Sequence, residues 1–160
     1  MQHLKPRRAF ALAATTALTA GAIVGTGASY AKSHTAHAAA TTIHVIEHAK
    51  TDLEIPLNGK DGKGNPLTFN NPVFNVANQK QVGHDEGFCM RIAPKKGIWE
   101  CLWTTFLKGG QITVQGPYYD KKNSVLSITG GTGAYRNARG EMALNARNGG
   151  AEYDFIFQIS

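Results

Sequence analysis

Several features that mark common functional classes are missing from this 160-residue sequence. It has no run of basic residues and no basic helical stretch, so a nucleic-acid partner is not expected. It has no Gly-Lys-Ser or Gly-Lys-Thr tripeptide, which a P-loop requires to hold phosphates. Beyond the N-terminal segment, helical periodicity is almost absent and short β-rich runs recur instead. These absences favour a small, strand-rich domain that binds a ligand or catalyses a reaction.

Metal ligands are also scarce. His44, His48 and His84 have no partners at metal-ligand spacing, and surface positions are the simpler interpretation of all three. The segment "NGKDGKGN" at 58–65 contains a single acid, Asp61, among lysines, whereas a calcium loop needs alternating acids and a late glutamate. We therefore interpret this segment as a turn, and we expect neither a metal nor another cofactor.

The N-terminus has the order of a secretory signal peptide. Three basic residues stand in the first eight positions, and Ala9–Ala28 is uncharged and rich in Ala, Thr and Gly. Small residues then stand two apart at Ser29 and Ala31, and again between positions 36 and 40. Cleavage is expected after Ala31, with Ala38–Ala40 as the second option. An uncleaved anchor and a disordered leader are the alternatives, but a run made mainly of Ala, Thr and Gly would insert poorly into a membrane.

Cleavage at this point defines the expected domains. Residues 1–31 would be the signal peptide, 32–41 a flexible tail, and 42–160 a single β-barrel domain in a secreted protein. Three of the 17 basic residues and none of the 11 acidic ones lie in the leader, so the formal charge falls from +6 to +3. That charge is too mild to predict a polyanionic partner, and no stable membrane insertion is expected once the leader has been removed.

Alternating apolar residues and turn residues predict eight strands. The expected ranges are Thr42–Ala49, Leu67–Val76, Gln81–Ala93, Ile98–Leu107, Gln111–Tyr118, Ser124–Thr129, Arg139–Ala146 and Ala151–Ile159. The fold class is therefore all-β, and an eight-stranded antiparallel barrel is favoured because closure removes the sheet edges. A barrel of this size has room for one small ligand.

The two cysteines flank a predicted hairpin. With its turn centred near Lys95, residues whose numbers sum to 190 lie opposite each other, and Cys89 and Cys101 meet that condition. In an exported chain with no other cysteine, this spacing predicts a structural disulfide. Two independent thiols are the main alternative.

The glycine-rich stretch "GGTGAYRNARG" lies between two predicted strands. A phosphate-binding loop would be followed by a helix, but the residues that follow here continue as strands. Gly130, Gly131 and Gly133 are therefore interpreted as structural turn residues that allow positive φ and close backbone approach. Tyr135 would cover one end of the barrel.

This stretch resembles the signature of plant dirigent proteins, and "GGQITVQGPYYDKKNSVLSITGGTGAY" is similar to the matching region of plant allene oxide cyclases. The two families share an eight-stranded barrel that typically forms trimers. The resemblance runs from about Thr42 to Ser160, with its most specific part in the C-terminal third. It implies the same fold, a small hydrophobic ligand and a homotrimer.

The resemblance also implies candidate site residues. Glu47 stands where the cyclases keep a glutamate and dirigent proteins an aspartate, an acid that manages developing positive charge or abstracts a proton. Asn71 matches an asparagine that helps to hold a water, Cys89 a pocket cysteine and Tyr118 a pocket tyrosine. Ala49 replaces a second water-holding asparagine, and the cyclase Ser-Pro pair is not reproduced. These departures argue against allene oxide cyclisation itself as the reaction.

Strand parity bears on the same residues. Ile43, Val45 and Glu47 share one face of the first strand, so Glu47 either enters the lumen or ends the strand paired with solvent or with an arginine such as Arg91. Trp99 and Trp103 share a face with Cys101, and they either line a cavity or fill the core.

Two functions remain open at this point. The first is a secreted isomerase or cyclase-like barrel that binds a small hydrophobic or aromatic molecule and guides its cyclisation or stereoselective coupling. Glu47 would be its acid/base, Tyr118 a hydrogen-bond donor and Asn71 a positioning group, with Cys89, Trp99 and Trp103 in the pocket wall. The second is a non-catalytic lipocalin-like carrier or an extracellular structural protein.

Overall fold

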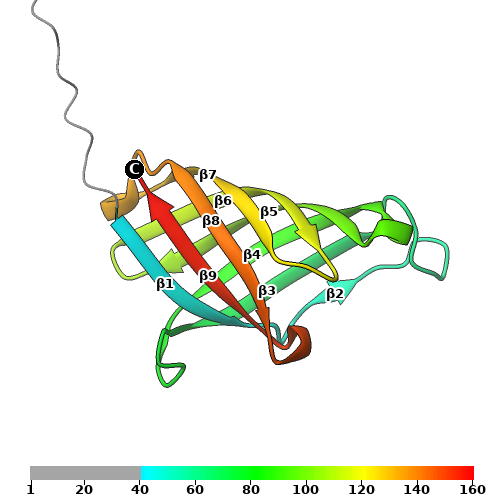
Figure 1. The fold of residues 1–160 in the computed structure, drawn as a ribbon, viewed down its shortest axis with the longest axis horizontal. Coiled ribbons are helices and arrows are strands. Elements are labelled where there is room, and N and C mark those ends of the chain that lie inside the picture. The colour runs from blue at the N-terminus through cyan, green and yellow to red at the C-terminus, as the bar shows by residue number, and fades with distance from the viewer. Residues whose placement is uncertain (1–40) are drawn as a thin grey trace, which may run out of the picture. The chain divides into compact units, whose positions relative to one another are not determined.

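The computed structural model describes residues 41–160, which form a closed β-barrel (Figure 1). Its strands are β1 Thr41–His48, β2 Leu53–Glu54, β3 Pro66–Asn75, β4 Gln81–Ala93, β5 Ile98–Leu107, β6 Gly110–Tyr119, β7 Ser124–Gly131, β8 Gly140–Arg147 and β9 Glu152–Ile159. Three single turns of 3-10 helix lie between strands, at Pro94–Lys96, Gly133–Tyr135 and Asn148–Gly150. The signal peptide and the tail up to residue 40 lie outside the described residues.

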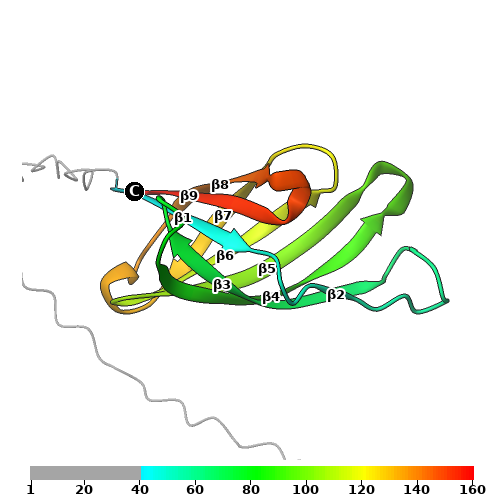
Figure 2. The same cartoon turned by 90° about the horizontal axis from the view of Figure 1, so that it is seen from below.

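Every strand pairs antiparallel with its neighbours in the order β1-β9-β8-β7-β6-β5-β4-β3, and β1 also pairs with β3. The β1–β3 register brings Glu47 opposite Val73 and closes the sheet into a cylinder (Figure 2). β2 is a two-residue addition to the edge of β3. The predicted eight-stranded barrel is confirmed, and each of its strands lies within two residues of its expected bounds.

The connections divide between the two ends of the barrel. The β3–β4 hairpin, the β5–β6 turn and the β7–β8 connection share one end with Thr41 and with the C-terminus; we call this the glycine end. The β1–β3 segment, the β4–β5 hairpin, the β6–β7 turn and the β8–β9 turn form the other end, which we call the cavity end. Figure 1 shows the C-terminus and the β4–β5 hairpin at opposite extremes of the barrel.

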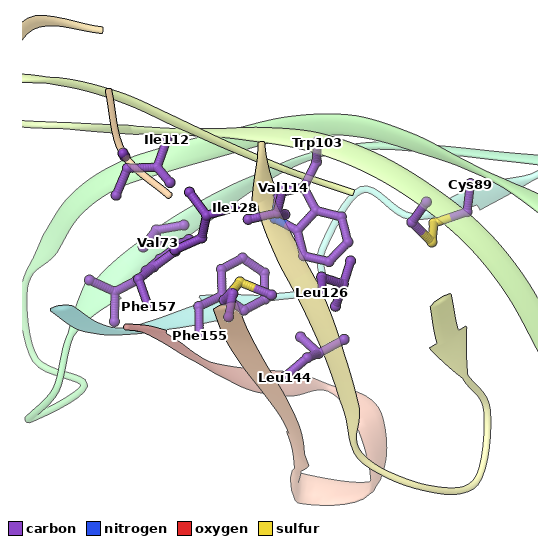
Figure 3. Close-up of a cluster of buried hydrophobic side chains, with 14 of the residues drawn as sticks. Val73, Cys89, Trp103, Ile112, Val114, Leu126, Ile128, Leu144, Phe155 and Phe157 are labelled. Atoms are coloured by element: carbon purple, nitrogen blue, oxygen red, sulfur yellow. A yellow bond between two sulfur atoms is a disulfide. The ribbon is translucent and has the colours of Figure 1, made fainter. Parts of the chain in front are cut away.

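The core fills the glycine half of the lumen. Alternate residues of the strands point inward, as period-two geometry requires, and Phe157, Ile112 and Met142 are fully buried there. Figure 3 shows aliphatic side chains from β3, β6 and β7 meeting Phe155 and Phe157 from β9. This half of the barrel is therefore a packed core and not a channel.

The glycine-rich connection closes that end of the barrel. The backbone N–H of Ala134 donates to Gly109 O at 2.8 Å, and that of Thr132 donates to Gln111 O at 2.9 Å. Gly133 has a φ of 59°, and a Cβ on Gly131 would lie 2.6 Å from Gln111 O, which leaves no room for a side chain. The predicted strand-to-strand role is confirmed.

The disulfide between Cys89 and Cys101 is formed. The two residues are directly opposite on β4 and β5, with their Cα atoms 4.0 Å apart. Both are buried and point into the lumen near the cavity end. The predicted pairing of the two cysteines is therefore confirmed.

In the part of the chain from 41 to 160, no helix is long and apolar enough to cross a membrane.

Candidate functional site

A cavity opens at the cavity end of the lumen. Most strands of the barrel contribute to its wall, which comprises Glu47, Asp52, Leu67, Phe69, Cys89, Cys101, Trp103, Tyr118, Leu144, Tyr153 and Phe155. The empty space between the lining atoms, open mouth included, is about 370 Å³. The cavity is thus large enough to hold one small molecule.

Glu47 is the acid at the centre of this site. It is the last inward-facing residue of β1 and only 5% exposed, although it lies near the strand end. Its Oε1 accepts a hydrogen bond from Asn71 Nδ2 at 2.6 Å, and the same amide donates to Asp52 Oδ1 at 2.6 Å. Of the two alternatives that the sequence left open for Glu47, the structure has the side chain in the lumen. Arg91 pairs elsewhere and does not neutralise it.

Asn71 is fixed from both ends of its amide. Its Oδ1 accepts from the backbone N–H groups of Lys50 and Thr51 at 2.9 and 2.8 Å, which forces its NH2 group toward the carboxylates. Its own backbone N–H donates to Asp85 Oδ1 on the neighbouring strand at 3.2 Å. Asn71 is fully buried and does not line the cavity itself. Its geometry suits the positioning of Glu47 better than direct contact with a ligand.

Two carboxyl groups here resist ionisation. The pKa of Glu47 is raised well above its usual value, first by burial and then by the nearby charge of Asp85, and the bond from Asn71 offsets only part of this. Burial also raises the pKa of Asp85, to about 7. Because Asp85 is fully buried and its Oδ2 has no partner among the described residues, its neutral form is favoured.

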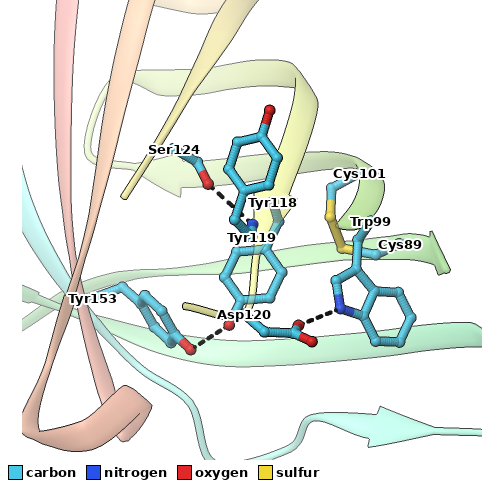
Figure 4. Close-up of a disulfide and its surroundings, with 8 residues drawn as sticks. All are labelled: Cys89, Trp99, Cys101, Tyr118, Tyr119, Asp120, Ser124 and Tyr153. Carbon is cyan, nitrogen blue, oxygen red and sulfur yellow. Dashed lines mark hydrogen bonds between the residues drawn. A yellow bond between two sulfur atoms is a disulfide. The ribbon is translucent and has the colours of Figure 1, made fainter. Parts of the chain in front are cut away.

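Tyr118 reaches the cavity from the C-terminal end of strand β6. Its hydroxyl lies 2.9 Å from that of Tyr153, so the two phenols form one hydrogen-bonded pair across the lumen (Figure 4). Burial is the main cause that raises the pKa of both hydroxyls, which therefore stay protonated at neutral pH. The pair keeps one O–H free to donate to a ligand.

The aromatic candidates divide into two roles. Trp103 lines the cavity, with its ring 5.5 Å from that of Phe155 and 6.0 Å from that of Phe69 (Figure 3). Its indole N–H is buried and has no partner among the described residues. Gly87 lies opposite Trp103, and any side chain there would collide with it. Cys89, as half of the disulfide, also lies in the cavity wall.

Trp99 is buried on the same face but is not among the side chains that line the cavity. Its indole N–H donates to Asp120 at 2.8 Å, and the guanidinium of Arg91 stacks 3.7 Å from the centre of its ring. Arg91 also pairs with Asp61 at 2.9 Å and with Asp120 at 2.7 Å. This cluster ties the β2–β3 loop and the β6–β7 turn to β4 beside the cavity mouth.

Sequence reasoning missed Asp52, Asp85, Tyr153 and the Arg91 cluster. Asp85 carried a usable signal, because it lies four residues before the inward-facing Cys89 and so shares its face. Asp52 carried none, since it lies in a loop where no periodicity applies. Tyr153 stands on the face of Phe155 and Phe157, a pattern that could have indicated it.

The described residues contain no group of three His, Cys, Asp or Glu side chains arranged to hold a metal ion. The cavity instead combines the carboxyl group of Glu47, the hydrogen-bonded phenols of Tyr118 and Tyr153, and the buried indole N–H of Trp103. Such groups can transfer a proton and bind polar atoms of a ligand held against the rings.

Among solved structures, the chain is similar to pyocyanin demethylase, with 25% identity and a TM-score of 0.61 over 72% of this chain and 98% of that one. It also shares its fold with the pterocarpan synthase dirigent protein GePTS1 (19% identity, TM-score 0.63, 76% of this chain and 85% of that one). A third similar structure is AbnU, an exo-specific intermolecular Diels-Alderase (12% identity, TM-score 0.61, 76% and 98%).

The family model described as dirigent-like protein matches residues 28–159, which is most of the sequence. This match includes all nine strands and every residue of the cavity wall. Together with the antiparallel barrel and its glycine-rich β7–β8 connection, it shows that the chain belongs to the dirigent-like protein family.

Proposed function

We propose that this barrel binds a small hydrophobic or aromatic molecule in its cavity and guides the cyclisation or stereoselective coupling of that molecule. The family and the fold support this proposal, because barrels of the same architecture include a dirigent protein and a Diels-Alderase. Reactions of this kind depend mainly on holding one conformer of a reactant in place. A cavity lined by aromatic rings suits that task.

The observation that carries the proposal is the buried carboxyl group of Glu47 in a largely apolar wall. A carboxyl group in such a place costs stability, since an apolar side chain of similar size would fill the space without loss of hydration. A raised pKa at a cavity wall is typical of groups that exchange protons with a ligand. A simple carrier of apolar ligands has no need of this acid.

The proposed roles follow from the geometry. Glu47 acts as general acid or base, because burial raises its pKa and so favours a form that holds a proton it can transfer. Asn71 holds its carboxyl group in place through the 2.6 Å hydrogen bond. Tyr118, paired with Tyr153, donates a hydrogen bond to an oxygen of the ligand. The rings of Phe69, Trp103 and Phe155 select the shape of the bound conformer.

Secretion and assembly belong to the same proposal. The disulfide is consistent with an oxidising compartment outside the cytoplasm, which the expected signal peptide at 1–31 would provide. A homotrimer is the expected assembly.

The test compares the protein with its Glu47→Gln variant, because Gln keeps the shape of the side chain but cannot exchange a proton. Each is incubated with a small-molecule extract of the cells that make the protein, and bound and free compounds are separated by chiral chromatography and weighed by mass spectrometry. We expect the variant to return a bound molecule unchanged. The wild-type protein should replace it with an isomer of the same mass, for cyclisation, or with a single stereoisomer of a coupled product.

The same experiment also tests the alternative that the protein is a non-catalytic carrier. If wild type and Glu47→Gln return the same molecule unchanged, the cavity binds without turnover and the barrel is a carrier. Asp154→Asn is unsuitable as a control because Asp154 pairs with His44 and Arg147. Glu100→Gln is suitable, because Glu100 is exposed on the outer face of β5 and its change removes one negative charge without altering the cavity wall.

A further inference from the structure

We propose that the ligand of this cavity is an aromatic molecule that carries a positive charge. This inference rests on the proposed function and specifies the chemical class of its ligand. The observation behind it is that two carboxyl groups and five aromatic rings share a wall that contains no basic side chain.

The acids are concentrated around one point. Glu47 and Asp52 line the cavity, and Asn71 Nδ2 lies 2.6 Å from a carboxylate oxygen of each. Asp85 lies directly behind them, bonded to the backbone N–H of Asn71. Two carboxyl groups thus share the side-chain amide of Asn71, and a third accepts from its backbone N–H. Nothing in the overall composition requires this, because the whole chain has a formal charge of +6.

Among residues 41–160, no basic side chain forms an ion pair with these acids. None of the side chains that line the cavity is Lys, Arg or His. Arg91, the buried arginine near the mouth, is occupied by Asp61 and Asp120 and stacks on Trp99. A protein that needs such acids only for structure usually pairs them with a basic residue. Here the cationic partner is best supplied by the ligand, whose charge would offset the cost of ionising Glu47.

The aromatic side chains of the wall suit the ring system of an aromatic cation. Phe69, Trp103, Tyr118, Tyr153 and Phe155 supply five rings to the cavity. Aromatic rings attract a cation, and the attraction is strongest where water is excluded.

The test uses three probes of nearly equal size that differ in charge: N-methylquinolinium (cationic), 1-methylnaphthalene (neutral) and 1-naphthoate (anionic). Their affinities for the full exported protein are measured by equilibrium dialysis. We expect the cation to bind about ten-fold more tightly than the neutral probe, which corresponds to about 1.4 kcal/mol. The anion should bind more weakly than the neutral probe.

Two variants test whether Asp52 and Glu47 cause the preference for the cationic probe. Asp52→Asn and Glu47→Gln should each reduce the ratio between cation and neutral probe by several-fold, while the affinity for 1-methylnaphthalene stays within about two-fold. Asp52 is exposed, so its variant is not expected to disturb folding. Glu100→Gln, with the same change of charge on the outer face of β5, should leave the ratio unchanged.

The outcomes separate this inference from the function on which it rests. Equal binding of cation and neutral probe, or a ratio that both variants leave unchanged, overturns the charge preference and leaves the proposed function standing. Failure of all three probes to bind the wild-type protein contradicts a ligand cavity altogether. Equal binding of the probes to wild type and to Leu144→Trp, which places a large ring in the cavity wall, contradicts it as well.

Discussion

Asn71 determines more of the site than its uncharged amide would lead one to expect. Its two polar atoms face opposite ways, with the oxygen toward the backbone after β1 and the nitrogen toward Glu47 and Asp52. A carboxamide in this place can satisfy acceptors on one side and donors on the other, which neither Asp nor Leu can do. The position of the catalytic candidate therefore depends on a residue that does not line the cavity.

Asp85 permits a test of the buried acids by stability alone. Its pKa is about 7 in the folded protein, against 3.8 for an ordinary aspartate, so the folded state keeps a proton that the unfolded chain has lost. Its contribution to the free energy of unfolding is therefore present below about pH 4 and is lost as the pH rises to about 7. We expect Asp85→Asn to raise the free energy of unfolding at pH 8 by about 1–3 kcal/mol. Urea unfolding with the disulfide intact measures it.

The comparison at low pH is the control for this prediction. At pH 3, below the ordinary pKa of 3.8, Asp85 is mostly protonated in both states. Asp85→Asn should therefore change stability much less there than at pH 8, because Asn retains the acceptor for the Asn71 N–H. An equal change at both pH values would show that packing, and not ionisation, decides the effect.

Residue-level prediction succeeded where strand parity applied. Glu47, Cys89 and Trp103 lie on the faces that alternation assigned to them, because a pleated strand allows only two orientations. Parity cannot distinguish a residue that lines a cavity from one buried beside it, as Trp99 shows. Asp52 was beyond reach, since its place depends on the path of a loop from β1 to β2.

At the scale of elements, the turns were as informative as the strands. The β4–β5 hairpin turns through Pro94–Lys96 and ends at Gly97 with a φ of 63°, which glycine adopts without strain. This turn sets the register that brings Cys89 opposite Cys101. β2 was not predicted because two residues are too few to show alternation. Its place comes from pairing with β3, which is a tertiary effect.

The β7–β8 connection yields a prediction about folding. A Cβ at Gly131 would collide with the carbonyl oxygens of Tyr135 and Gln111, and backbone atoms in a closed turn cannot move away. We expect Gly131→Ala to lower the free energy of unfolding by about 2–4 kcal/mol. Urea or thermal unfolding measures the loss.

Gly130 provides the matched control. The nearest atom to a Cβ at Gly130 is Arg139 Nη1 at 3.9 Å, so Gly130→Ala should change stability by less than about 1 kcal/mol. The folded fraction of the Gly131→Ala protein should bind 1-methylnaphthalene as wild type does, because the cavity lies at the other end of the barrel. Normal stability with lost binding would instead make this connection part of a ligand site.

At the scale of the whole molecule, the outer surface of the barrel has an apolar patch. Phe88 is 49% exposed, and Leu53, Met90, Ile92 and Leu102 lie exposed on the same stretch of β2, β4 and β5. Thr68 and Phe88 are cross-strand partners, as are Phe88 and Leu102, so the patch is continuous. Exposed apolar surface of this kind marks contacts with other molecules.

This patch makes the expected homotrimer testable. If it is the subunit interface, Phe88→Ser together with Leu102→Ser should reduce the mass in sedimentation equilibrium from three chains to one. Val125→Ser, at a 54% exposed site on β7, should leave the mass unchanged. A wild-type mass of one chain would show the trimer prediction to be wrong, and a trimer that survives the double change would place its interface elsewhere.

The division of the barrel into two ends has a practical consequence. β1 begins and β9 ends at the glycine end, since Thr41 pairs with Ile159, while the mouth of the cavity faces the opposite way. Any tag, dye or solid support joined at Ser160 is therefore held away from the mouth. The barrel can be immobilised through its C-terminus with its opening toward the solution, an orientation suited to a sensor chip for aromatic compounds.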